Sequence, residues 1–161
     1  MIGRNGRTSR KREGDGCTPI GMWKLGELYY RADRLSRPKS GLFTRPSRRD
    51  EAWCDDVSDR RYNLKIRVAH EGASEGFWRR DCAYDIMAPT SHNTRPRVRG
   101  LGSAIFFHLW GERNTGTAGC VALRLADMRK ILPRLSRHTV LVIWPAGNGP
   151  PGALQKSPSR P

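Results

Sequence analysis

The sequence predicts a mainly β protein, and three observations support that prediction. Short runs rich in aromatic and apolar residues recur along the chain, as in residues 17–30 and 78–87. The chain also contains 17 glycines and 11 prolines, many of them between these runs, which favours strands joined by tight turns. Only one stretch has the three-and-four spacing of an amphipathic helix. We therefore expect strands to form most of the core.

Residues 104–110 give the clearest strand. They form an apolar and aromatic run bounded by Gly102 and Gly111, which is typical of a buried strand. His108 is the only ionisable residue in that run. The β-branched and apolar run at residues 139–144 predicts a last buried strand.

The helical spacing lies near the C-terminal end. Its apolar residues recur every three or four positions, and Pro133 should end or bend the helix. By contrast, residues 34–60 are rich in Arg, Pro, Ser and Asp, which favours a long surface loop. The apolar positions of the helix are Leu125, Met128, Ile131, Leu132 and Leu135.

The composition along the chain predicts one folded domain between two polar ends. Residues 1–16 are mostly Gly, Arg, Lys and Ser and predict a flexible basic arm. Residues 17–144 hold the expected elements, and residues 145–161 form a Gly, Pro and Ser tail that we expect to be disordered. The sequence shows neither the roughly 18-residue apolar run of a membrane span nor the apolar core of a secretory signal.

The charge is strongly positive. Thirty Lys and Arg against fifteen Asp and Glu give a formal net charge of +15. Such a surface favours contact with nucleic acid, acidic lipid or an acidic wall polymer, and it is equally compatible with a merely solvated basic surface. The four cysteines are widely spaced without a CxxC pair, so the sequence predicts neither a zinc site nor a particular disulfide.

Residues 115–123 (TGTAGCVAL) are the segment with the clearest chemical potential. A turn of small residues presents Cys120 shortly before the predicted helix, where the helix dipole would favour a thiolate. The backbone N–H groups of Gly119 and Cys120 could stabilise an oxyanion. A free thiol has a pKa of about 8.5, so a nucleophilic cysteine needs a neighbouring base.

His108 is the candidate for that base. It lies near the end of the predicted strand that leads into the cysteine turn, so a return of the chain can bring the two side chains together. The alternatives are a small buried cysteine and a strand histidine bonded to a backbone carbonyl.

The same residues resemble the L,D-transpeptidase (YkuD-type) family. Its members carry a strand histidine and then Ser or Thr, any residue, Gly, Cys and an apolar residue. The resemblance extends over roughly residues 11–144. Its matching positions are His108, Thr117, Gly119, Cys120 and Val121, together with residues 11–21 (KREGDGCTPIG), 30–34, 53–56 (WCDD), 62–63, 78, 84–85 and 102–108 (GSAIFFH).

The resemblance implies a β-sandwich or partly closed barrel with a short helix after the cysteine. It also implies Cys120 as nucleophile, His108 as proton donor and acceptor, and Gly119 as an oxyanion-binding N–H. Substrate contacts are expected at Thr117 and Asn93. Many members have Arg two residues after the cysteine; Ala122 stands there, and Arg124 is a possible substitute for binding the substrate carboxylate.

The implied activity is acyl transfer on peptidoglycan stem peptides, without metal or organic cofactor, in the cell envelope or periplasm. An amine acceptor would make the chain a transpeptidase, whereas water would make it an L,D-carboxypeptidase. Two other readings remain open: an inactive relative that only binds peptidoglycan, and a basic nucleic-acid-binding protein. The resemblance itself predicts no nucleic-acid partner.

Overall fold

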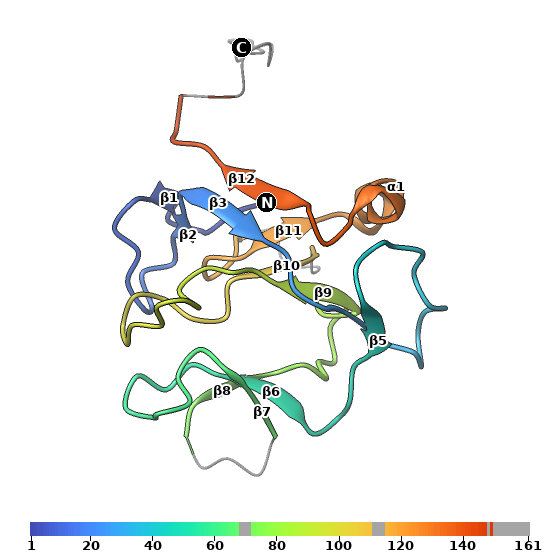
Figure 1. Cartoon of the computed structure of the whole chain (residues 1–161), viewed down its shortest axis with the longest axis horizontal. Helices are drawn as coiled ribbons and strands as arrows, with labels where there is room; N and C mark the ends of the chain where they lie inside the picture. The colour runs from blue at the N-terminus through green and yellow to red at the C-terminus, as the bar shows by residue number, and fades with distance from the viewer. Residues whose placement is uncertain (68–71, 111–114, 148, 150–161) are drawn as a thin grey trace.

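The computed structural model describes residues 1–67, 72–110, 115–147 and 149. A five-stranded open sheet, in the order β11-β10-β9-β4-β5, forms the centre of the fold. Figure 1 shows the β3–β12 pair on one side of it and the β7-β6-β8 sheet on the other. The fold is therefore mainly β and sandwich-like, with sheets that do not close into a barrel.

The strands are short and lie at the following positions: β1 (Arg7–Thr8), β2 (Thr18–Pro19), β3 (Gly21–Lys24), β4 (Leu28–Tyr30), β5 (Thr44–Pro46), β6 (Glu51–Cys54), β7 (Lys65–Arg67), β8 (Ser74–Gly76), β9 (Ile86–Pro89), β10 (Phe106–Leu109), β11 (Val121–Leu123) and β12 (Val140–Ile143). The helical segments are α1 (Leu125–Ile131) and the 3₁₀ turn η1 (Leu132–Arg134).

The alternation of side chains along β10 divides the core into two layers. Phe107 and Leu109 face a cluster of aliphatic side chains to which Met128 and Leu132 of the helical segment also belong. Phe106 faces the opposite side and packs among aromatic rings. Because neighbouring side chains on a strand point to opposite faces, β10 contributes to both layers at once.

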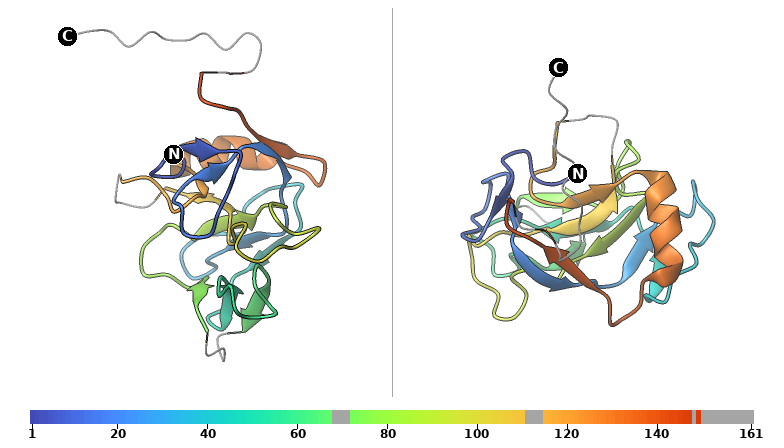
Figure 2. Two further views of the ribbon diagram at one scale, coloured as in Figure 1. Left: turned by 90° about the vertical axis from the view of Figure 1, so that its left-hand side faces the viewer. Right: turned by 90° about the horizontal axis from the view of Figure 1, so that it is seen from above.

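The end of the chain matches part of the prediction. The apolar spacing does form a helix, and Pro133 lies in the 3₁₀ turn that ends it. A strand also forms at β12, but its first three residues are not buried. The prediction of a buried strand was therefore wrong for these three residues, because β12 pairs only with β3 and covers one side of the central sheet. Figure 2 shows this arrangement from above.

Two other segments differ from the expectation. Residues 34–60 contain β5 and β6, where we had expected a surface loop. Glu51, the first residue of β6, explains why the composition did not indicate that strand, because its side chain is only 2% exposed. It accepts hydrogen bonds from Arg45 and from the backbone of Arg48, and it pairs with Lys65. A buried carboxylate with several partners makes a core strand look polar in sequence. In residues 78–87, only Ile86 and Met87 enter a strand.

The first sixteen residues are part of the folded domain, although we expected a flexible arm. The backbone N–H of Arg4 donates to the carbonyl of Thr117 at 2.8 Å, and the N–H of Thr117 donates to Ile2 at 3.0 Å. The Lys11 side chain is buried in an ion pair with Asp15. The two backbone bonds attach the segment to the cysteine turn, and the ion pair stabilises the segment itself. Of the expected tail, residues 148 and 150–161 lie outside the described part.

Candidate active site

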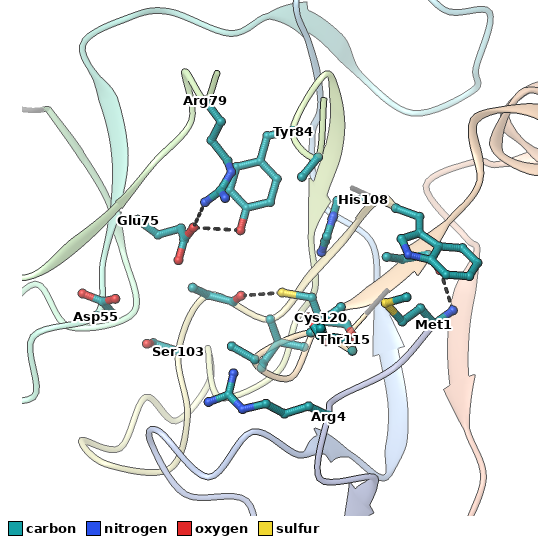
Figure 3. Close-up of a pocket in the computed structure, with 18 of the residues that line it drawn as sticks. Met1, Arg4, Asp55, Glu75, Arg79, Tyr84, Ser103, His108, Thr115 and Cys120 are labelled. Carbon is teal, nitrogen blue, oxygen red and sulfur yellow. Dashed lines mark hydrogen bonds and ion pairs between the residues drawn. The ribbon is translucent and has the colours of Figure 1, made fainter. Parts of the chain in front are cut away.

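Cys120 and His108 come from neighbouring parallel strands. β10 pairs with β11 in the register that places Phe107 beside Val121 and His108 beside Ala122. Cys120, one residue before Val121, therefore faces the same side of the sheet as Phe106 and His108. The side chains of Cys120 and His108 both reach one cavity of about 680 Å³ (Figure 3).

The Cys120 thiol lies against the start of β10. Its Sγ donates to the carbonyl of Ala104 at 3.2 Å and accepts the N–H of Phe106 at 3.3 Å. Burial raises the pKa of Cys120 to about 12; the Phe106 N–H and the charges of Lys11 and Arg79 act in the opposite direction. The thiol is therefore protonated at neutral pH in this state.

The imidazole of His108 is also neutral. Burial lowers its pKa to about 4, although nearby carbonyl oxygens favour the charged ring. Nδ1 lies 2.7 Å from the carbonyl oxygen of Leu109, which can only accept a hydrogen bond. We therefore assign the ring proton to Nδ1, which leaves Nε2 as the basic nitrogen. The group that orients His108 is thus a backbone carbonyl, and the ring of Tyr84 packs edge-on against it.

The turn before the cysteine is held by Thr117. Its hydroxyl donates to the carbonyl of Cys120 at 2.7 Å and accepts the N–H of Gly119 at 3.1 Å. A side chain at Gly119, which has φ 143°, would place its Cβ 2.8 Å from the carbonyl oxygen of Cys17. The Gly119 N–H, which we expected to bind an oxyanion, thus already donates to the Thr117 hydroxyl in this structure.

The helix dipole is not part of this site, contrary to the expectation. β11 separates Cys120 from α1, which begins only at Leu125. The dipole effect is confined to the first turn of a helix. The helix therefore does not stabilise a thiolate at Cys120.

The other expected substrate contacts lie outside the cavity. The side-chain amide of Asn93 donates to the carbonyls of Val98 and Gly102, so it organises its own loop. Arg124 packs over the ring of Trp110, 5.0 Å from its centre. Trp110 lines the cavity whereas Arg124 does not. Their roles in substrate binding remain predictions.

Several charged groups around the cavity escaped the sequence analysis. Glu75 accepts hydrogen bonds from Arg79 at 2.8 Å and from the Tyr84 hydroxyl at 3.1 Å. Figure 3 shows this group on the wall opposite the cysteine turn. Asp55 lies on the same wall, with one buried oxygen that has no hydrogen-bond partner among the described residues. The only signal for such residues was that Tyr84 and Asp55 belong to the stretches that resemble the family.

The comparison with known families decides the identity. A family model described as YkuD, the L,D-transpeptidase catalytic domain, matches residues 1–143. The chain belongs to the YkuD family. No curated protein and no solved structure matches it. YkuD enzymes act on peptidoglycan.

Within the described residues, no helix is long and apolar enough to cross a bilayer. In the same part of the chain, no three His, Cys, Asp or Glu side chains are grouped to hold a metal ion.

The buried His108 should make this YkuD domain sensitive to acid. Its pKa is about 4 when folded, against 6.5 for a free imidazole, so between these values the unfolded chain binds a proton that the folded chain does not. The stability that comes from keeping His108 neutral is thus fully present above pH 6.5, and it is lost as the pH falls to 4. With about 1.4 kcal/mol for each pKa unit, the loss is about 3 kcal/mol. Urea unfolding followed by tryptophan fluorescence measures it.

His108→Gln provides the control for this pH dependence. Glutamine does not titrate, so the variant should lose less stability between pH 6.5 and 4 than the wild type. Burial also lowers the pKa of His92, and this second histidine keeps its share of the effect in both proteins. Equal pH slopes for the two proteins would contradict a buried neutral His108.

Proposed function

We propose that this chain is an L,D-transpeptidase that cross-links peptidoglycan stem peptides through a thioester on Cys120. The observation that supports the proposal is the convergence of Cys120 and His108 on one face of the sheet and in one cavity. A protonated thiol and a neutral imidazole that line the same cavity suit general-base activation, in which the proton moves as the sulfur attacks. A substrate of this kind places the enzyme's action in the cell envelope.

The first half-reaction forms the acyl-enzyme. Nε2 of His108 takes the thiol proton while Sγ attacks the carbonyl carbon of the third residue of the stem. Backbone N–H groups of the cysteine turn stabilise the resulting oxyanion, with Gly119 turning from Thr117 to the substrate. The carbon–nitrogen bond then breaks, His108 returns the proton to the departing amine, and the D-amino acid at position four leaves.

The second half-reaction releases the sulfur. His108 deprotonates the incoming amine of a second stem, which attacks the thioester carbonyl, and the thiol is reprotonated as the carbon–sulfur bond breaks. Water in place of the amine gives the carboxypeptidase reaction. The transpeptidase and carboxypeptidase reactions need the same pair of residues, so only their products distinguish the two activities.

The test of this function combines turnover with mass spectrometry. We expect wild-type protein to release the fourth residue from a tetrapeptide donor and to join the remaining tripeptide to an added amine. A carbapenem, whose strained amide can acylate a nucleophilic thiol, should add once to the intact protein. Release of tripeptide alone would identify the carboxypeptidase. A folded protein that neither turns over the donor nor takes up the carbapenem would contradict the proposal.

A further inference from the structure

The cations around the cavity differ in how far their charge is neutralised. Lys11 pairs with Asp15, and Arg79 bonds both to Asp81, at 2.9 and 2.7 Å, and to Glu75. Arg4 also lines the cavity, but its guanidinium has no hydrogen bond or ion pair with any part of the chain that the structure describes. Its charge is therefore available to a ligand.

Two glycines allow Arg4 to lie close beside the cysteine turn. A Cβ at Gly116 would lie 2.6 Å from the Cα of Arg4, so only glycine allows this approach. A Cβ at Gly16 would lie 3.2 Å from Cγ and Nε of Arg4. Both glycines have positive φ, 79° and 66°. The glycines leave room for Arg4 against the turn, and the backbone bond from Arg4 to Thr117 holds its main chain there.

The position of the side chain completes the arrangement. Arg4 lines the same cavity as Cys120, and Figure 3 shows it beside the cysteine turn. The opposite wall carries the carboxylates of Asp55 and Glu75. Because Glu75 is paired with Arg79 whereas Arg4 has no such partner among the described residues, the guanidinium of Arg4 attracts a negatively charged group in the cavity.

We infer that Arg4 binds the terminal carboxylate of the donor peptide and so selects donors that end in a free acid. The inference rests on the proposed function, in which the leaving residue carries that carboxylate one residue from the attacked carbonyl. A guanidinium matches a carboxylate with two parallel hydrogen bonds. Arg4 would thus supply the recognition that Ala122, two residues after the cysteine, cannot.

The experiment compares two donors on four proteins. One tetrapeptide ends in a free carboxylate and the other in an amide, and kcat/KM is measured for wild type, Arg4→Gln, Arg4→Lys and Arg10→Gln. Arg10 is exposed and does not line the cavity, so its variant removes one charge without touching the site. The alkylation rate of Cys120 by iodoacetamide shows whether the cysteine turn is unchanged.

We expect Arg4→Gln to lower kcat/KM for the acid donor by about 10- to 100-fold, the usual range for a lost charged hydrogen bond, and to leave the amide donor unchanged. Arg4→Lys should retain part of the preference, and Arg10→Gln all of it. An unchanged preference in Arg4→Gln would overturn the inference. An equal loss on both donors would also overturn it, since the bound carboxylate would then belong to another part of the peptide.

Binding separates this inference from the proposed function. Calorimetry of both tetrapeptides with Cys120→Ser and with Cys120→Ser/Arg4→Gln needs no turnover. Weaker binding of the acid donor alone in the double variant supports Arg4 even if the wild type releases no product. Identical binding of the acid donor to both proteins overturns the role of Arg4 whatever the activity.

Discussion

Replacing Cys120 with serine is expected to abolish the carbapenem adduct and to slow release of the fourth residue by at least about 10³-fold. A serine hydroxyl is less acidic and less nucleophilic than a thiol, so proton transfer to His108, whose pKa burial lowers to about 4, is less favourable for serine than for cysteine. The sulfur also lies between the Ala104 carbonyl and the Phe106 N–H, a geometry that serine can keep. Intact mass and donor turnover measure the two effects.

Two other cysteines provide matched controls. Cys17 lies beside the same turn, where its carbonyl faces Gly119, and its thiol donates to the carbonyl of Asn5 at 3.3 Å. Cys82 is partly exposed and does not line the cavity. Cys17→Ser and Cys82→Ser should keep the adduct and turnover close to the wild type. An adduct that persists in Cys120→Ser and disappears in either control would move the nucleophile elsewhere.

The strand that carries His108 was predictable because its pattern is local. The apolar run around His108 indicates a buried strand, and the small residues before Cys120 indicate a turn. The parallel register between β10 and β11 was not predictable from either segment. A shift by one residue would put Cys120 on the opposite face from His108, because side chains alternate along a strand.

The walls of the cavity were harder to predict for another reason. Arg4 and Lys11 belong to a segment with so few apolar residues that its composition indicates an arm. That segment is held by backbone bonds to the cysteine turn and by the Lys11–Asp15 ion pair. Neither kind of interaction produces a periodic pattern of apolar residues in the sequence. Glu75 and Arg79 bond to each other locally, four residues apart, but Glu75 reaches this part of the fold through the pairing of β8 with β6, a contact between distant parts of the chain.

Replacing His108 with glutamine is expected to lower kcat for acyl transfer by about 10²- to 10⁴-fold at neutral pH. Glutamine is similar in size and can still bond to the Leu109 carbonyl, but it cannot accept the thiol proton. Because burial raises the pKa of Cys120 to about 12, almost no thiolate forms without that transfer. The defect should shrink as the pH rises, since hydroxide then deprotonates the thiol directly.

The pH profile distinguishes proton transfer from a structural role. Wild-type activity should persist in mild acid and fall only as the pH approaches 4, where His108 takes up a proton, whereas His108→Gln should lack this acid limb. His92→Gln is the matched control: His92 is a second buried histidine, bonded to the Leu101 carbonyl at 2.9 Å outside the cavity. It should retain the wild-type profile. Turnover by His108→Gln within about threefold of wild type, at every pH, would exclude His108 as the base, because positioned proton transfer contributes at least about 10²-fold.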